Sequence, residues 1–205
     1  MHKKYGGGVA YMIYLKEMQG SEKALIKKLY IDSFPSEERK PFSMMLRLRR
    51  KKKANLWVIH DKISDNAVGL AFMLLWKDKV LFDYFAIMPE YQSKGYGSEV
   101  IKELKKCYNG KCIFGEVEPV DETAPNNAQR IRRMDFYLRN GFKETGLYVS
   151  LFGCVLQLMY MGDEAITYSE YIEFLQYIFG IRGKSIVKKN VGLVSQTPQN
   201  YEEKN

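Results

Sequence analysis

Apolar and polar positions along the chain change between patterns typical of strands and patterns typical of helices. Residues 56–60, 68–76 and 81–88 are rich in β-branched and aromatic side chains, and short polar turns separate them. These three runs predict an antiparallel meander of strands. The next segment carries apolar residues at helical spacing up to position 108, and Gly110 follows it. It therefore predicts a helix that ends near Gly110.

The remaining pattern predicts further helices and strands on both sides of this meander. Thr167 and Glu170 form a capping-box pattern that opens the final helix. From Arg182 onward the chain is polar and aperiodic, so we expect one domain over residues 1–181 and a flexible tail over 182–205. The other expected elements are a strand at 9–15, helices at 21–33 and 36–54, a strand at 112–117, a helix at 128–140 and a hairpin at 147–161.

One connection in this pattern sets the fold class. A helix joins the strand at 81–88 to the strand at 112–117, and a crossover of that length implies that the two strands are parallel. The other neighbouring strands are joined by short turns. We therefore expect an α/β fold with a mixed, mostly antiparallel sheet and helices on its faces. Ligands in such folds bind beyond the carboxyl ends of the parallel strands.

Composition and charge narrow the class of protein. The chain has 205 residues, 46% hydrophobic and 27% charged, as soluble globular proteins have. Three cysteines without a C-x-x-C pair and two histidines favour neither a disulfide framework nor a metal site. The apolar runs are too short to cross a bilayer and no signal peptide is visible, so we expect a cytoplasmic protein without a membrane partner. The net charge of +8 favours an anionic partner.

A glycine loop stands at the carboxyl end of the strand at 81–88. The stretch "PEYQSKGYGSEVIKEL" places Gly95 and Gly97 at the start of the following helix. A helix N-terminus offers free N–H groups and partial positive charge, so such a loop can bind phosphate oxygens. The spacing matches neither a Walker loop nor the G-x-G-x-x-G dinucleotide loop. A simple tight turn is the alternative interpretation.

The same loop resembles a known signature. "PEYQSKGYGSEVI" is similar to the acyl-CoA-binding pattern Q/R-x-x-G-x-G/A of the GCN5-related N-acetyltransferase (GNAT) superfamily. "FYLRNGF", residues 136–142, resembles the second landmark of that family, a tyrosine one turn before a Gly-Phe pair. The order of the predicted elements between about residues 11 and 160 also follows the family fold.

The resemblance implies a role for particular positions. It implies that Tyr137 protonates the departing CoA thiolate and that Glu116 acts as general base. Phe85, Ala86 and Ile87 would pair with the pantetheine arm of acetyl-CoA. The pyrophosphate of acetyl-CoA would be held by the backbone of the segment Gln92, Ser93, Lys94, Gly95, Tyr96, Gly97 and Ser98.

Two arginines depart from the family pattern. Arg130 and Arg133 stand where many relatives carry Asn and Ala, on the same predicted helical face as Tyr137. These cations would favour a phosphate or thiolate nearby. Glu118 lies two residues after Glu116 and would share its face in a regular strand, so either carboxylate could be the base.

Three functions follow from these patterns. The first is transfer of an acetyl group from acetyl-CoA to an amine acceptor by direct attack in a ternary complex, and no spacing rule identifies the acceptor. The second is a non-catalytic acyl-CoA-binding sensor or scaffold. The third is nucleic-acid binding through the basic run at 47–53, which is less favoured because no aromatic residues are interleaved with it. The C-terminal helix could supply a homodimer interface.

Overall fold

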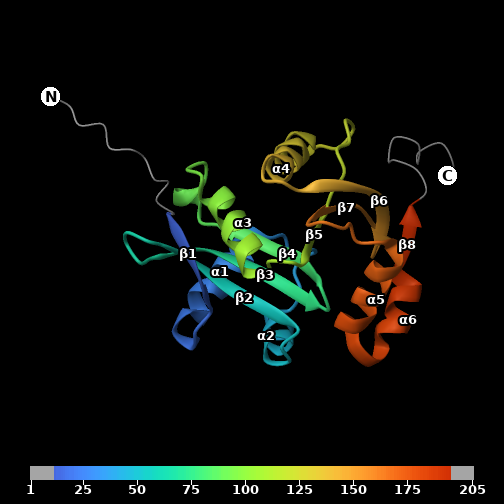
Figure 1. Ribbon diagram of the computed structural model, residues 1–205, viewed down its shortest axis with the longest axis horizontal. Coiled ribbons are helices and arrows are strands. Elements are labelled where there is room, and N and C mark those ends of the chain that lie inside the picture. Colours follow the sequence, from blue (N-terminus) through green and yellow to red (C-terminus); the bar gives the residue numbers. More distant parts are fainter. Residues whose placement is uncertain (1–11, 195–205) are drawn as a thin grey trace.

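The computed structural model describes residues 12–194, and an eight-stranded mixed sheet crosses the whole molecule (Figure 1). The strand order is β1-β2-β3-β4-β5-β7-β6-β8, and β4 and β5 form a parallel pair among antiparallel neighbours. The strands are β1 (Ile13–Glu17), β2 (Ala54–Asp61), β3 (Ala67–Trp76), β4 (Lys79–Ile87), β5 (Cys112–Val117), β6 (Lys143–Leu151), β7 (Cys154–Met161) and β8 (Val191–Val194).

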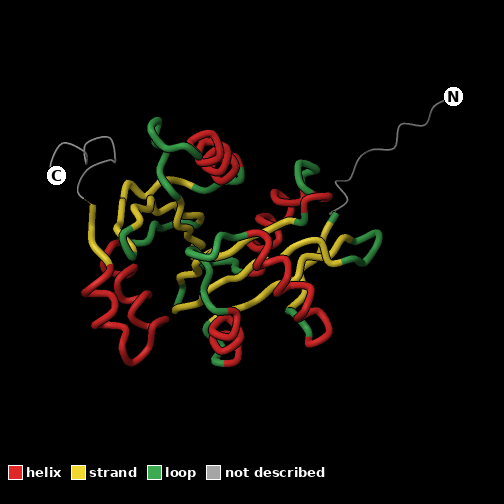
Figure 2. Tube along the Cα trace, turned by 180° about the vertical axis from the view of Figure 1, so that it is seen from behind, coloured by secondary structure: helices red, strands yellow, loops and turns green. Residues whose placement is uncertain are grey.

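Helices cover both faces of the sheet, and each face has its own hydrophobic core (Figure 2). One core contains residues of α1, α2, α5 and α6, and the other contains residues of α3 and α4. We call these the α5 face and the α4 face. The helices are α1 (Lys23–Ser33), α2 (Phe42–Arg50), α3 (Tyr96–Cys107), α4 (Asn127–Arg139), α5 (Tyr168–Phe179) and α6 (Gly183–Asn190).

The predicted fold class is confirmed. The meander β2-β3-β4 is antiparallel, α3 joins β4 to β5, and those two strands are parallel. The capping box that opens α5 is also present, because the Thr167 hydroxyl accepts from the backbone N–H of Glu170 at 3.2 Å and the Glu170 carboxylate accepts from the N–H of Thr167 at 2.8 Å.

Two predicted segments differ from the structure at their ends. The helix expected over 36–54 is confined to Phe42–Arg50, because Pro41 disfavours a helical conformation at Lys40 and stands at the N-cap of the helix. The strand expected at 9–15 is β1, Ile13–Glu17, while residues 9–11 lie outside the described part of the chain.

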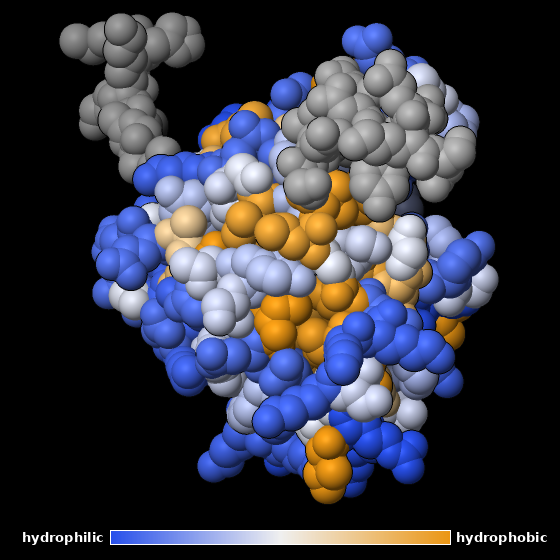
Figure 3. Space-filling model, turned by 90° about the vertical axis from the view of Figure 1, so that its right-hand side faces the viewer, coloured by the Kyte–Doolittle hydropathy of each residue, from blue (hydrophilic) through white to orange (hydrophobic). Residues whose placement is uncertain are grey.

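The segment after Arg182 also differs from the expected flexible tail. Residues 183–190 form α6, which packs on α5, and residues 191–194 form β8, which pairs with β6 at the edge of the sheet. Val187 and Val194 are buried. The segment is less polar than its lysines suggest, since it contains Ile186, Val187, Val191, Leu193 and Val194, and the edge of β6 offers it backbone hydrogen bonds. Figure 3 views this side of the molecule, where apolar side chains gather on the surface.

Candidate active site

A gap between the two parallel strands forms the centre of the candidate site. Pairing between β4 and β5 comprises only Lys79 with Cys112, Val80 with Ile113 and Leu81 with Phe114. Beyond this point β4 continues to Ile87 along β3 and β5 continues along β7. The backbone of β4 at 85–87 therefore has strand partners on the β3 side alone, among the described residues. The other edge can pair with an extended ligand.

The loop after β4 is shaped as a cradle of free amides. Gly95 has a φ of +86° and directly precedes α3, and the side chain of Gln92 ties the loop back to the carbonyl of Ile87 at 2.7 Å. Lys94 donates to the carbonyl of Glu90 at 2.6 Å. The N–H of Glu99 bonds to the carbonyl of Gly95 at 3.2 Å, so the three N–H groups before it, at 96–98, form the N-terminal end of α3. Free amides at a helix N-terminus suit a phosphate group.

The second glycine of the loop permits close helix packing. A Cβ built on Gly97 would lie 3.1 Å from the ring of Phe136 on α4. Tyr96 fixes the same turn from the other side, because its hydroxyl donates to Asp61 at the end of β2 at 2.5 Å. The loop is thus held between α4 and β2.

We predict that Gly95→Ala destabilises the protein, because the left-handed conformation costs a residue with a Cβ about 1–2 kcal/mol. The expected result is a melting temperature lower by about 2–8 °C, measured by circular dichroism. Gly20→Ala is the matched control, since Gly20 has open space around it and no positive φ. Equal melting temperatures for both variants would show that the loop does not depend on this glycine.

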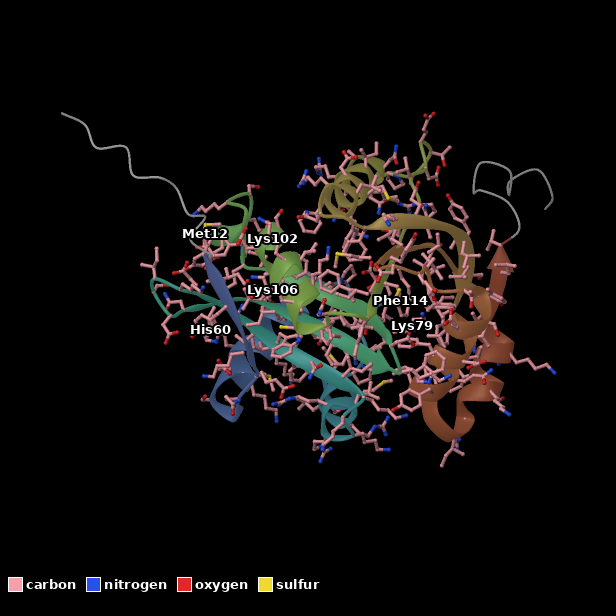
Figure 4. The ribbon with its side chains drawn as sticks, in the orientation of Figure 1. Met12, His60, Lys79, Lys102, Lys106 and Phe114 are labelled. Atoms are coloured by element: carbon pink, nitrogen blue, oxygen red, sulfur yellow. The ribbon has the colours of Figure 1, made fainter. Side chains whose placement is uncertain are left out.

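Glu116 points from β5 into the gap on the α5 face. Phe114, two residues earlier on the same face, lies in that core and is labelled in Figure 4. The hydroxyl of Tyr171 on α5 donates to the Glu116 carboxylate at 2.8 Å. The pKa of Glu116 is raised to about 7, chiefly by burial; the charge of Lys40 and the hydrogen bond from Tyr171 oppose this rise, and the charge of Asp83 adds to it. A carboxyl group with a pKa near neutrality is suited to general base catalysis.

An ion pair on the same face lies close enough to act on Glu116. Lys40, which precedes α2, contacts both oxygens of Asp83 on β4 at 2.8 and 3.0 Å. The Asp83 side chain is 6% exposed and the Lys40 side chain 30% exposed. Tyr84 encloses the pair from the side, because its ring lies under the Lys40 ammonium and its hydroxyl accepts from the Lys40 backbone N–H. The sequence pattern did not bring these residues together.

Tyr137 approaches the gap from the opposite face. Its ring lies on α4 and packs edge-on against Phe82 of β4 at 6.2 Å and Phe142 at 5.1 Å between ring centres. Burial raises the pKa of Tyr137 to about 12, and the charge of Arg133 lowers it. No described residue forms a hydrogen bond with the Tyr137 hydroxyl. The Tyr137 hydroxyl is therefore protonated at neutral pH, and it can donate a hydrogen bond to a bound ligand.

The predicted base and the predicted acid thus belong to the two different cores that meet at the gap. Glu116 extends from the strand face that carries Phe114 and meets Tyr171 of α5, on the side of the α5-face core. Tyr137 packs in the core of the α4 face, which also contains Phe85 and the start of α3. A substrate threaded between β4 and β5 would meet one group on each side of the sheet.

The structure places the arginines and Glu118 differently from the sequence prediction. Glu118 follows the end of β5 and pairs with Arg130 at 2.9 Å and Arg133 at 3.2 Å, so it does not share the face of Glu116. Side chains alternate between the two faces only within the strand, and β5 ends at Val117. The guanidinium groups of Arg130 and Arg133 then hold the Glu118 carboxylate near α4. The two arginines are therefore already paired with a carboxylate, and their predicted role beside acetyl-CoA stays a prediction.

The basic run at 47–53 is divided between α2 and the turn that follows it. Arg47 and Arg50 are exposed, while Arg49 pairs with Glu17 at 3.4 Å. The Lys53 ammonium lies 3.6 Å from the ring centre of Tyr177. The fold thus brings an aromatic residue beside the basic run, although the local sequence has none. That residue, Tyr177, belongs to α5, and the Lys53 ammonium lies over its ring.

Among the described residues, the structure shows neither a metal-binding cluster nor a membrane-spanning helix. Between residues 12 and 194, no cluster of three or more His, Cys, Asp or Glu side chains has an arrangement that could hold a metal ion. Within the same range, none of the helices is both long and apolar enough to span a membrane.

Comparison with known proteins relates this part of the chain to a family of acetyltransferases. Residues 52–144 match the family described as acetyltransferase (GNAT) domain. That range contains β4, the glycine loop, α3, β5 and α4, which together form most of the site. A sequence comparison with curated proteins gave no match.

Solved structures of similar fold extend the likeness over most of the chain. A GNAT-family protein from Bacteroides thetaiotaomicron is 21% identical, with a TM-score of 0.65 over 83% of this chain and 98% of that chain. Spermidine N-acetyltransferase from Vibrio cholerae, solved with CoA and spermine, is 18% identical, with a TM-score of 0.58 over 80% and 99%. A ribosomal L7/L12 alpha-N-protein acetyltransferase is 14% identical, with a TM-score of 0.53 over 78% and 98%.

The eight-stranded mixed sheet with its one parallel pair has the fold of these solved acetyltransferase structures. Residues 52–144 match the GNAT acetyltransferase domain, and the fold of the chain is similar to that of solved GNAT-family acetyltransferases.

Proposed function

We propose that this protein is an N-acetyltransferase that transfers the acetyl group of acetyl-CoA to an amine acceptor by direct attack in a ternary complex. The observation that carries the proposal is the pair of groups at the gap between β4 and β5. Glu116, with a pKa of about 7, lies on one face, and protonated Tyr137 lies on the other.

The residues around the gap fit acetyl-CoA as cosubstrate. The N–H groups at the start of α3 can donate hydrogen bonds to phosphate oxygens, with Gly95 and Gly97 keeping that part of the loop free of side chains. The open edge of β4 at Phe85, Ala86 and Ile87 offers backbone groups to the amides of a pantetheine arm. When bound, acetyl-CoA supplies a thioester, whose carbonyl carbon is open to attack by an amine.

Glu116 and Tyr137 would divide the proton transfers. An acceptor amine with a pKa near ~10 is protonated at neutral pH and cannot attack until it loses a proton. The Glu116 carboxylate takes that proton, directly or through a water molecule. As the new C–N bond forms and the C–S bond breaks, the Tyr137 hydroxyl gives its proton to the departing sulfur. The second proton of the acceptor nitrogen then replaces the one that Tyr137 gave.

Binding of acetyl-CoA should be visible before any acceptor is known. At about 100 times its dissociation constant, acetyl-CoA is expected to stabilise the fold by about 2.7 kcal/mol, which corresponds to a melting temperature higher by roughly 5–10 °C. CoA should act similarly, and ATP at the same concentration should not. Thermal unfolding with each of the three ligands measures this. No stabilisation by acetyl-CoA or CoA would mean that the loop at 92–98 is only a turn.

The acceptor can be sought among primary amines of several classes. The relatives of similar fold include an enzyme for spermidine and one for a ribosomal protein N-terminus. A panel should therefore combine polyamines, peptides with free N-termini and lysine-containing peptides. Activity with one class alone would assign the acceptor, and binding of acetyl-CoA without transfer to any amine would favour the sensor or scaffold.

A further inference from the structure

We propose that Tyr171, on the C-terminal helix α5 and outside the family match at 52–144, is a positioning residue that holds the Glu116 carboxylate in its orientation for taking the acceptor's proton. The proposal rests on the proposed function, in which Glu116 is the base. Two observations carry it: the hydrogen bond of 2.8 Å between the two side chains, and the complete burial of Tyr171.

The packing around Tyr171 directs its hydroxyl toward Glu116. The side chain is 0% exposed, and its ring packs edge-on against Phe114, two residues before Glu116 on β5. A buried tyrosine hydroxyl without a partner would be costly, and Glu116 is the only partner that the described residues give it. The contact of the ring with Phe114 and the hydrogen bond to Glu116 therefore both fix the position of α5 relative to β5, the strand that carries the base.

The charged or titratable groups that face Glu116 all come from elements other than its own strand β5. Tyr171 comes from α5, Lys40 from the segment before α2, and Asp83 from β4, while Tyr84 of β4 senses the charge of Glu116 as well. Tyr171 in turn faces Glu116, Asp83 and its neighbour Tyr168. Among the groups on Glu116, Tyr171 is the one that donates a hydrogen bond to it.

The direction of the donation decides what Tyr171 does. Burial raises the pKa of Tyr171 well above its ordinary value, so the phenol keeps its proton and donates a hydrogen bond to the Glu116 carboxylate, which when ionised can only accept. A donor stabilises the carboxylate form and lowers the pKa of Glu116, against the effect of burial. Removal of the hydroxyl should therefore leave a base that is harder to ionise and free to rotate.

The test is Tyr171→Phe, with Tyr177→Phe as matched control. Tyr177 lies on the same helix, but it is 39% exposed and its hydroxyl donates to no described group. The ionisation of Glu116 is followed by carbon-13 NMR of glutamate side chains, with Glu116→Gln to assign the signal. We expect Tyr171→Phe to raise the pKa of Glu116 by about 1, and Tyr177→Phe to leave it unchanged. The pH at which kcat reaches its plateau should rise by the same amount, with KM for acetyl-CoA unchanged.

A second variant guards against a folding defect in the first. Incorporation of 3-fluorotyrosine at position 171 keeps the ring and strengthens the donor, so it should lower the pKa of Glu116. Unchanged titration of Glu116 in both variants would overturn the proposal and leave Tyr171 a packing residue. The NMR titration needs no turnover, so it shows whether Tyr171 controls the ionisation of Glu116 even if the wild-type protein lacks transferase activity, a result that would refute the proposed function.

Discussion

Glu116→Gln is expected to lower kcat by about 10²–10³-fold at pH 7.5, since general base catalysis contributes factors of this size. Glutamine keeps the shape of the side chain and can still accept the hydrogen bond from Tyr171. The measurement is the steady-state rate of thiol release with a saturating acceptor, once an acceptor is known. A rate within a factor of three of wild type would remove Glu116 from the mechanism.

The pH dependence of the same reaction gives a sharper signature. Glu116 acts as a base in its ionised form, so wild-type kcat should rise with pH and level off above about pH 7, the pKa that burial gives this group. In Glu116→Gln that plateau should disappear, and the rate should follow the fraction of unprotonated acceptor, about tenfold per pH unit.

Stability provides the control for this variant. The pKa of Glu116 is raised from 4.5 to about 7 on folding, so the folded protein binds this proton more tightly than the unfolded chain. The contribution of the group to stability is therefore full below about pH 4.5 and is lost as the pH rises through about 7. At pH 8 the melting temperature of Glu116→Gln should equal or exceed that of wild type. A lower value would mean that lost activity reflects lost structure.

Tyr137→Phe is expected to lower kcat by about 10–10²-fold while the dissociation constant of CoA stays unchanged. The phenylalanine ring can keep the contacts with Phe82 and Phe142, and only the proton donor is lost. The effect is smaller than that of the base because a thiol near pKa ~8.5 is a good leaving group without an acid. Stopped-flow measurement of the chemical step and calorimetry of CoA binding separate the two quantities.

The contradicting outcomes for Tyr137 are distinct. An unchanged chemical step would show that water or another group protonates the sulfur. Weakened CoA binding with an unchanged kcat would make Tyr137 part of the binding surface instead. Melting temperatures of wild type and variant should agree, since the Tyr137 hydroxyl has no partner among the described residues.

The sequence predicted the elements that depend on local patterns. The strand Cys112–Val117 and the capping box at Thr167 appear as expected, because alternation, turn residues and caps act over a few positions. The parallel pairing of β4 and β5 followed from the length of the connection between them. The two glycine-loop positions and the order of the elements identified the family in advance.

The parts that the sequence did not predict depend on contacts between distant segments. Lys40 and Asp83 are 43 positions apart, and Glu116 and Tyr171 are 55 apart. Tyr171 appeared in the sequence only as one apolar position of the last helix. A tyrosine at a core position signals a buried hydroxyl that needs a partner, but not which partner. Local alternation likewise placed Glu118 beside Glu116, whereas Arg130 and Arg133 hold it near α4.

The central claim is tested most directly by incubation of the purified protein with acetyl-CoA and the amine panel. Thiol release is followed with a chromogenic disulfide, and mass spectrometry examines the amines. We expect thiol release above the no-amine background with at least one amine, and a mass gain of about 42 Da on that amine, the mass of one acetyl group in place of hydrogen. Stabilisation by acetyl-CoA together with no thiol release and no acetylated amine across the panel would contradict the proposed transferase.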